Sequence, residues 1–597
     1  MAAAPDPAPA EAEAGGSGRS DGPADAEAGG SGRSDGPAET RGPAGWGWLR
    51  ARPEAGRWSR AGDAWRWVPL ACAAFYVVVL LATLRSLVAS IYLNADNASA
   101  PDIGQLVSRA PHFAEIVLGN APWYTALWFE QLTGGLPGHR TLWELAPWIL
   151  TLIGIALVAW AAALVAGRSA GVIIALTCGC AGATLLPLQF GWAVHAVAYV
   201  HICVLGAFVV PLALRSGRIR GWPFHVALTA LVAVVTGLGM ASDKLVIVGG
   251  LAPFVIAGAV LSYLTPPEVA RRVLWSVLGV AVGASGVAVL ATSAAHSADV
   301  VPAPFPISFA ALGELPGHLA DLVGSLAILA NGDFSGDTPS LTSVLALLCA
   351  GAAVIGIYAA LRSGRVFMRE LAARGRRPDA GASSRAAALS AFLAFWAATA
   401  VLVSAAFVLT SVPKGLLSSR YVVTVGYAVV VIVAVTVANS AAAWRAALVA
   451  AGSSAIILAA GVSLAQRQIQ TKAYAPTRPI ATQLERFAAR EHLTIGYAGY
   501  WDASPLTWEL DARLRVYPVI QCGAKLCPFP YHKISTWYLP RPLARTFFLV
   551  DSRLISEHAY GAITTVPSSW GPPAQVAHIG QLTVYIYPYN LAEKLLP

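Results

Sequence analysis

Long runs of apolar residues recur along most of the chain, separated by short polar connections. Each run holds about twenty residues, the length of α-helix that spans roughly 30 Å of hydrocarbon. The pattern therefore predicts a polytopic α-helical membrane protein with about eleven transmembrane helices. The connections near Pro187 and Asp243 are very short, so one long broken helix is an alternative at either place. The runs lie at residues 68–88, 145–165, 170–188, 193–214, 223–241, 245–264, 273–294, 340–361, 386–410, 421–438 and 444–464.

Composition agrees with this pattern. The chain of 597 residues is 56% hydrophobic and only 12% charged, about half the charged fraction of an ordinary soluble domain. A soluble protein of this composition would expose apolar surface to water, so a lipid bilayer is the expected solvent for residues 67–465. Residues 1–66 differ, because the segment Ala12–Ala24 recurs identically at Ala26–Ala38 in a stretch rich in Gly, Ser and acids. Such low-complexity sequence predicts a disordered cytoplasmic tail.

The basic residues predict the orientation. Outer connections hold only Arg109, Arg140, Lys244, Lys414 and Arg420, and residues 295–340 hold no Lys or Arg. By the positive-inside rule, the N-terminus is cytoplasmic and the C-terminal region is extracytoplasmic in a multi-pass protein of the inner (plasma) membrane. Because the formal charge of +9 is scattered through loops, nucleic acid is not an expected partner. The connections predicted to lie inside hold Arg168, Arg215, Arg218, Arg220, Arg271, Arg272, Arg445 and seven arginines between 362 and 385.

Three segments on the predicted outer side are too long to be simple turns. They cover residues 89–143, residues 295–339 and the region from 466 onward. The first is expected to hold two short helices, at Pro101–Arg109 and Pro122–Gly134. The third combines a helical pattern at Ile480–Glu491 with strand-like runs, which predicts a small α/β domain over 466–597. Those runs are Thr494–Ala498, Thr546–Val550 and Leu582–Tyr587.

The cysteines fall into two groups, one in the apolar runs and one in the polar C-terminal region. Five of the seven lie in apolar stretches, where a free thiol packs like a small hydrophobic residue. Cys522 and Cys527 lie in the polar C-terminal region and could form a disulfide if that region faces an oxidising compartment.

Acidic residues follow the first apolar run directly. Asp96, in the segment Asn94–Ser99, stands where water meets lipid, and it could accept a proton from a hydroxyl or hold a divalent cation. The alternative is an ordinary loop acid or a helix N-cap. Asp102 is expected in the first turn of the following helix, where the helix dipole favours an acid.

Other ionisable residues flank later runs. Asp243 and Lys244 lie between two apolar spans, where charges are costly unless they are paired or wetted. Lys244 could bind a phosphate, and Asp243 could orient it or bind a metal ion; the alternative is a short outer turn. Arg420, six residues after Lys414, could meet a lipid phosphate or simply anchor the span in the interface. His195 near the outer end of the fourth span could line a cavity or be a packing residue.

Several function classes are disfavoured by the sequence. It has no glycine-rich loop of the nucleotide-triphosphate type, no strong Cys/His zinc spacing and no Gly-x-Ser-x-Gly elbow. A cytosolic ATP-driven machine is therefore not expected.

The arrangement resembles the GT-C superfamily of integral-membrane glycosyltransferases over residues 68–597. The shared features are the long first outer loop with two interfacial helices, an Asp soon after the first span (Asp96), and an outward C-terminal domain after about eleven spans. The stretch Gly499-Tyr500-Trp501-Asp502 is similar to bacterial members. The family often shows paired acids in the first loop, whereas Asn97 follows Asp96 here, so dependence on a divalent cation (Mg or Mn) stays open.

The resemblance implies transfer of a sugar, with inversion, from a polyprenyl-phosphate donor to an acceptor hydroxyl on a cell-envelope glycan, lipid or protein. In that reading Asp96 is the general base, and Lys244, Arg420 and Lys414 bind the donor phosphate. Asp243, Asp102 and His195 are supporting residues or metal ligands. Four aromatic residues of the C-terminal domain could stack on the acceptor or belong to its core: Trp501, Trp508, Trp537 and Tyr538.

Two other classes remain open from the sequence. A secondary transporter or lipid-sugar flippase predicts internal repeats and a polar site at mid-membrane. A non-catalytic scaffold for envelope assembly predicts that Asp96 and Asp243 do not share a cavity. The test is whether Asp96, Asp243, Lys244 and Arg420 lie together.

Overall fold

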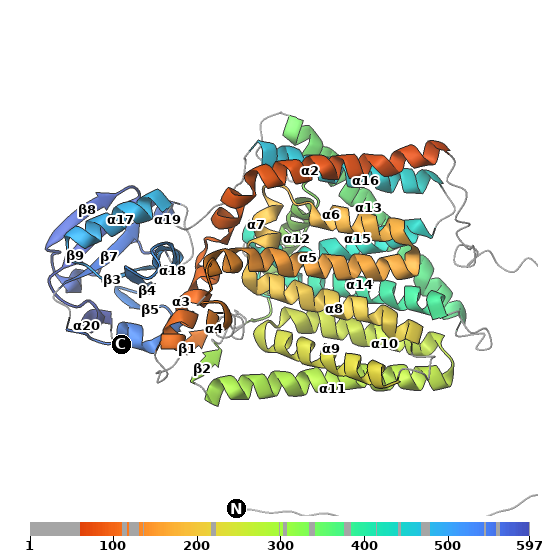
Figure 1. Cartoon of the computed structure of the whole chain (residues 1–597), viewed down its shortest axis with the longest axis horizontal. Coiled ribbons are helices and arrows are strands. Elements are labelled where there is room, and N and C mark those ends of the chain that lie inside the picture. The colour runs from red at the N-terminus through yellow and green to blue at the C-terminus, as the bar shows by residue number, and fades with distance from the viewer. Residues whose placement is uncertain are drawn as a thin grey trace, which may run out of the picture. The chain divides into compact units, whose positions relative to one another are not determined.

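The computed structural model contains a bundle of long helices with a β-sheet region at one end (Figure 1). It describes residues 60–109, 116–118, 130–134, 136–215, 222–297, 299–302, 307–332, 341–374, 384–413, 415–439, 443–466, 478–542, 545–556 and 562–595. The long helices are α2 (Arg60–Tyr92), α5 (His139–Ala166), α8 (Ala193–Arg215), α9 (Trp222–Ser242), α10 (Ala252–Leu264), α11 (Pro267–Ser297), α13 (Leu341–Arg374), α14 (Ser384–Leu409), α15 (Val423–Ala438) and α16 (Ala443–Ala465).

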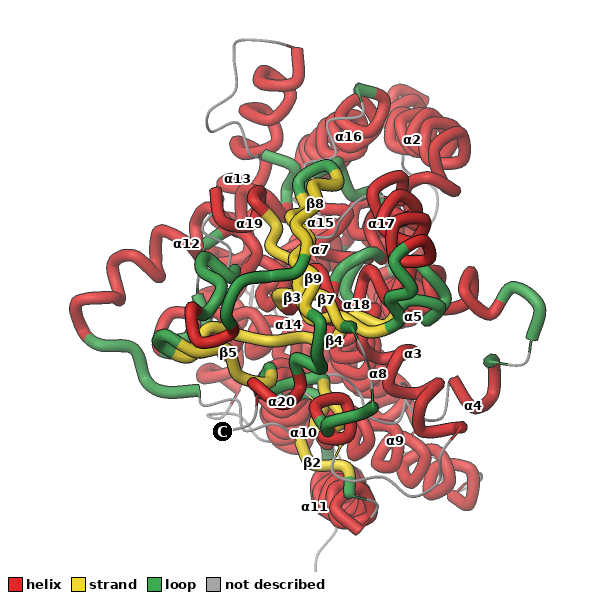
Figure 2. The backbone as a smooth tube through the Cα atoms, turned by 90° about the vertical axis from the view of Figure 1, so that its left-hand side faces the viewer, coloured by secondary structure: helices red, strands yellow, loops and turns green. Residues whose placement is uncertain are grey.

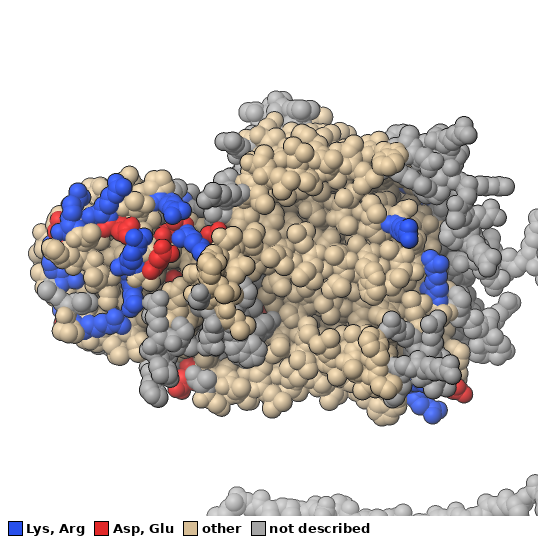
Figure 3. Space-filling view, viewed as in Figure 1, with Lys and Arg blue, Asp and Glu red and all other residues tan. Residues whose placement is uncertain are grey.

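The helices of the bundle are suited to a membrane. Among the described residues, nine helices are long and apolar enough to span it, and two shorter apolar helices lie at Arg168–Gly179 (α6) and Ser343–Ala359. Each of the eleven predicted runs coincides with one of these, so the predicted polytopic class is confirmed. On the face drawn in Figure 3, charged side chains gather over the C-terminal elements and at the far end of the bundle, and the belt between them is uncharged.

Small residues let neighbouring helices approach closely, as is usual in membrane bundles. Helix α9 packs along α11 and α10 also packs on α11. A Cβ added to Gly237 would lie 2.6 Å from the carbonyl oxygen of Ala284, and one on Gly258 would lie 2.4 Å from a methyl carbon of Val277. Larger residues at these two glycines would therefore push the helices apart.

The predicted connection near Pro187 is present at Gly191 and Trp192, where the helix breaks before α8, and the run 170–188 is itself broken. Helix α6 ends at Gly179, and the short helix α7 (Leu185–Phe190) contains Pro187 in its first turn, where the missing N–H of proline is tolerated. The unwound segment between them is stabilised by distant side chains, since unpaired backbone groups are costly in a membrane. The amide of Ala181 donates to Tyr76 Oη (3.2 Å), that of Gly182 to Asn331 Oδ1 (2.7 Å) and that of Ala183 to Ser463 Oγ (2.8 Å).

The second short connection does break at Asp243. Helix α9 ends at Ser242, and a π-helical turn, η2 (Ile247–Leu251), leads into α10. The Oδ1 atom of Asp243 accepts a hydrogen bond from the backbone amide of Leu245 (2.8 Å). Asp243 therefore caps the start of the next helical segment, as an aspartate does at a helix N-terminus.

The C-terminal region forms a six-stranded sheet in the order β5-β4-β3-β7-β9-β8. Strands β4, β3 and β7 are parallel, and the remaining pairs are antiparallel. The predicted helix and three strand-like runs coincide with α17, β3, β7 and β9, and Figure 2 shows this end of the molecule. The elements are α17 (Arg478–Arg490), β3 (Ile495–Gly499), α18 (Tyr500–Glu509), β4 (Arg515–Cys522), β5 (Lys525–Pro528), β7 (Thr546–Asp551), α19 (Ser552–Ser556), β8 (Gln575–Ile579), β9 (Leu582–Tyr587) and α20 (Ala592–Leu595).

Alternation along the strands builds two buried layers. Tyr497 and Phe548 contribute to one apolar cluster, and Ala498 and Phe547 contribute to another that includes residues of α17. Gly496 lies under the ring of Phe547, and a Cβ there would lie 2.2 Å from it, so a larger residue would disrupt the pairing of β3 with β7. A disulfide between Cys522 and Cys527 closes the β4–β5 hairpin.

A second, three-stranded sheet joins the three long segments. Strand β1 (Ile116–Leu118) comes from the first, β2 (Val300–Pro302) from the second and β6 (Lys533–Ile534) from the C-terminal region. Strand β1 pairs parallel with β2 and antiparallel with β6. The three segments therefore lie at the same end of the bundle.

The first long segment differs from the prediction at both helices. The helix predicted at Pro101–Arg109 begins six residues earlier, as α3 (Ala95–Arg109), because Asn94 caps it: Asn94 Oδ1 accepts the amide of Asn97 at 3.0 Å. Asp102 is consequently in the middle of a helix and not in its first turn, which Asp96 occupies. Of the helix predicted at Pro122–Gly134, the described part is α4 (Glu130–Thr133); residues 122–129 lie outside the described residues.

Candidate functional site

Asp96 lies in the first turn of α3, directly after the first membrane helix. The amide N–H groups at this end of a helix favour a negative charge. The start of α3 is fixed because the side-chain amides of Asn94 (3.3 Å) and Asn97 both donate to the carbonyl oxygen of Gly191. That carbonyl lies between α7 and α8, so the carboxylate is held against the membrane bundle.

A tyrosine from the C-terminal sheet region contacts Asp96. The phenol of Tyr500, the first residue of α18, donates a hydrogen bond to Asp96 Oδ1. The Tyr500 side chain is buried, and its ring stacks on Phe529 with centroids 4.2 Å apart and planes 7° apart. His532 lies on the same ring at 5.9 Å. The carboxylate therefore meets two separate parts of the chain.

Arg420 is the basic residue of the site. Its Nε donates to His195 Nε2 at 3.1 Å, and its guanidinium lies 4.2 Å from the ring centroid of Trp192 and 5.0 Å from that of Tyr421. Its own carbonyl oxygen accepts a hydrogen bond from the Tyr199 phenol. Aromatic faces orient a guanidinium by stacking and by attraction to the ring.

Asp243 reaches Arg420 through His195. Arginine can only donate hydrogen bonds, so His195 Nε2 must be the acceptor, and a neutral imidazole then carries its proton on Nδ1. That nitrogen lies 3.6 Å from Asp243 Oδ2, and both side chains are largely buried. The other carboxylate oxygen of Asp243 is occupied by the amide of Leu245. Asp243 thus lies beside the imidazole, at a distance longer than a hydrogen bond, and the imidazole orients the guanidinium.

The acidic and basic parts of the site are adjacent. Burial raises the pKa of Tyr500 well above its usual value, the charge of Asp96 raises it further, and the charge of Arg420 opposes this shift. The same phenol therefore responds to both charges. Burial lowers the pKa of His532, again with Asp96 opposing. The rings of Trp192 and Trp501 lie 6.5 Å apart and nearly perpendicular to each other. Because Trp192 also contacts the guanidinium of Arg420, the two rings connect Arg420 with α18.

The structure brings together four of the predicted residues. Asp96, His195, Asp243 and Arg420 belong to this site. Lys244 is exposed, next to Asp243. Asp102 is buried and lies against α18 and β4, in a small pocket that it lines with Ser504 and Trp537 among others. Lys414 lies outside the described residues.

The aromatic residues predicted to stack on an acceptor have different surroundings. Trp508, Trp537 and Tyr538 are buried among apolar neighbours, whereas Trp501 is half-buried and lies at the site. Sequence reasoning missed Trp192, His532 and the contact of Tyr500 with Asp96. The only available signal for Tyr500 was its place in the Gly499–Asp502 stretch.

In the described part of the chain, no group of three or more His, Cys, Asp or Glu side chains is placed to hold a metal ion. The divalent cation stays a prediction.

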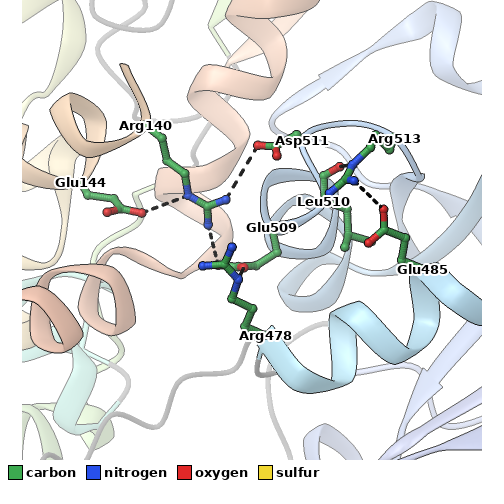
Figure 4. A network of polar contacts seen from close by, with 8 residues as sticks. All are labelled: Arg140, Glu144, Arg478, Glu485, Glu509, Leu510, Asp511 and Arg513. Carbon is green, nitrogen blue, oxygen red and sulfur yellow. Dashed lines mark hydrogen bonds and ion pairs between the residues drawn. The ribbon is translucent and has the colours of Figure 1, made fainter. Parts of the chain in front are cut away.

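A second charged cluster holds the other end of α18 (Figure 4). Arg140, at the start of α5, contacts Glu509 at 2.7 Å, Glu144 at 3.2 Å and Asp511 at 3.8 Å. Arg478 of α17 lies 3.8 Å from the same Glu509. The guanidinium of Arg140 also lies 5.3 Å from the ring centroid of Trp508. Helix α18 therefore contacts α3 at one end and the start of α5 at the other.

Comparisons with known proteins found little similarity to this chain. No protein-family model matches it, and no curated protein matches it. Among solved structures, it is similar to the crystal structure of ArnT from Cupriavidus metallidurans in the apo state, with 13% sequence identity, 88% of this chain and 100% of that chain covered, and a TM-score of 0.38.

Proposed function

We propose that this chain is a membrane glycosyltransferase that moves a sugar from a polyprenyl-phosphate donor to an acceptor hydroxyl, with inversion, at the extracytoplasmic face of the plasma membrane. One observation carries the proposal. Asp96, His195, Asp243 and Arg420 come from distant parts of the sequence and meet at the end of the bundle that adjoins the C-terminal sheet. A carboxylate beside an oriented guanidinium, next to lipid, suits a reaction between a hydroxyl and a lipid phosphate ester.

Asp96 has the role of general base. The acceptor oxygen bonds to the anomeric carbon on the face opposite the phosphate, and the bond from that carbon to the phosphate oxygen breaks. Polyprenyl phosphate leaves with the electron pair, and the hydroxyl proton passes to the Asp96 carboxylate. A single displacement of this kind inverts the configuration at the anomeric carbon.

Arg420 has the role of stabilising the departing phosphate. A planar guanidinium matches the oxygens of a phosphate, and a fixed donor aimed at developing charge stabilises the transition state. His195 and Trp192 hold the guanidinium in place. Lys244 and Lys414 are proposed to add positive charge near the lipid headgroup, and the apolar surface of the bundle to hold the prenyl chain. The acceptor, a glycan, lipid or protein, is proposed to enter beside Trp501.

The test is the substitution Asp96→Asn in the full chain in membranes. Removal of a general base reduces rates by about 10²–10⁴-fold, so transfer of radiolabelled pentose or hexose from polyprenyl phosphate should fall by at least that range at equal protein abundance. The matched control is Asp511→Asn, a carboxylate in the other cluster that is 67% exposed, which should keep full activity. Wild-type transfer by the Asp96→Asn protein would rule out the assignment. Lipid-sugar movement across the bilayer without transfer would favour the flippase.

A further inference from the structure

Tyr500 occupies an unusual place for a tyrosine of a sheet domain. It lies 404 residues from Asp96 in the sequence, yet its phenol donates a hydrogen bond to the carboxylate that opens α3. The side chain is 4% exposed. Because the phenol binds Oδ1, the other oxygen, Oδ2, is the one left to receive a proton.

The ring of Tyr500 is held from several directions. Phe529 stacks on it, and His532 lies almost parallel to it at 20°. The hydroxyl of Ser99, one turn after Asp96 on α3, donates to the carbonyl oxygen of Asp96 at 3.2 Å. A phenol fixed in this way presents its proton in one direction, toward Asp96. Such fixed placement is what a catalytic carboxylate requires from its surroundings.

The helix that carries Tyr500 is anchored just beyond it. Asp502, two residues later, is 1% exposed and lies beside Asp551 at the end of β7, close enough for the two acids to interact. Strands β3 and β7 are parallel neighbours, so this contact ties the first turn of α18 to the ends of the two central strands. At its other end α18 is held by Arg140 through Glu509. The position of the phenol is therefore fixed by both the sheet and the membrane bundle.

We propose that Tyr500 is a positioning residue for Asp96, supplied by the C-terminal sheet, so that the base is complete only when the sheet is docked on the bundle. This inference rests on the proposed glycosyl transfer. The hydrogen bond orients the carboxylate, selects Oδ2 as the proton acceptor and stabilises the ionised form that a general base needs. The C-terminal region thus takes part in the chemistry, in addition to any contact with the acceptor.

The test is Tyr500→Phe, which keeps the stacked ring and removes only the hydroxyl. Loss of a hydrogen bond to a charged group corresponds to a drop of about 10–100-fold, expected in kcat, with the KM for the polyprenyl-phosphate sugar unchanged. The acidic limb of the rate–pH profile should move upward by about one pH unit, so activity recovers in part as pH rises. A tyrosine with a purely structural role would not move that limb.

The matched control is Tyr538→Phe. Tyr538 is also buried in the sheet region, and its phenol donates to the carbonyl oxygen of Pro518, away from Asp96. This variant should keep the wild-type rate and pH profile. If Asp96→Asn is inactive while Tyr500→Phe keeps the wild-type profile, the positioning role is wrong and the proposed function stands. If Asp96→Asn is fully active, the proposed function itself is wrong.

Discussion

Helix α18 lies between two arginine-centred clusters that hold their arginines in different ways. Arg140 meets the carboxylates of Glu144, Glu509 and Asp511, which together more than balance its charge. Arg420 is held by the imidazole of His195 and by the faces of Trp192 and Tyr421. Imidazole and aromatic faces orient a guanidinium without neutralising it, and the charge of Asp96 also acts on Arg420. These partners agree with the proposed roles, in which Arg140 joins two parts of the chain and Arg420 binds the phosphate of the donor.

Separate replacement of the two arginines should give the largest difference in activity between the two clusters. Arg420→Gln removes the charge and the planar donor pair, and transfer should fall by about 10²–10³-fold, the range for loss of one transition-state donor. Arg140→Gln should lower activity much less after correction for abundance. The measurement is sugar transfer from polyprenyl phosphate in membranes, with both variants quantified by immunoblot. Equal losses in the two variants would contradict the distinction between the clusters.

The membrane helices were predictable because the hydrocarbon thickness requires long apolar runs, and those runs stand out at 193–214 or 444–464. The strands at 494–498 and 582–587 were predictable from their apolar and β-branched residues. Asp96, Asp243 and Arg420 were found as candidates because charges beside membrane spans are costly. The charge of these three residues was enough to mark them as candidate site residues, and their catalytic and binding roles stay proposals.

Long-range side-chain contacts account for what the sequence did not reveal. The break at 180–184 depends on Tyr76, Asn331 and Ser463, three residues that no local pattern connects with it. The meeting of Tyr500 with Asp96 depends on how the sheet docks on the bundle. Asp102 was misplaced because the cap at Asn94 starts α3 earlier than the proline at 101 suggested.

Asp502 offers a different kind of test, because its partner is another acid. Burial and the neighbouring Asp551 raise the pKa of Asp502 well above its usual value, with Arg553 opposing. The folded chain therefore favours the protonated carboxyl. Its stabilisation is complete below the unfolded pKa of about 4 and is lost progressively as pH rises toward the folded pKa. The slope over that window is at most about 1.4 kcal/mol per pH unit.

Asp502→Asn should remove this pH dependence, since an amide of nearly the same shape does not titrate. The measurement is thermal unfolding of the detergent-solubilised full chain between pH 5 and pH 9. Wild type should lose stability relative to the variant as pH rises. Glu593→Gln, an exposed acid of α20, should follow the wild-type curve. Parallel curves for wild type and Asp502→Asn would show that the acid pair does not retain its proton.

The smallest expected effect belongs to the contact between Arg140 and Glu509. The two side chains are 25% and 7% exposed, so water and salt weaken the attraction, and a coupling energy of about 1 kcal/mol is expected in a double-mutant cycle of Arg140→Gln and Glu509→Gln. Because the charges are partly exposed, the coupling should shrink as salt is raised. The cycle is measured by thermal unfolding at low and high salt. A coupling of several kcal/mol that salt leaves unchanged would instead indicate a buried pair, and Arg140 would then resemble Arg420 more closely than the present contacts allow.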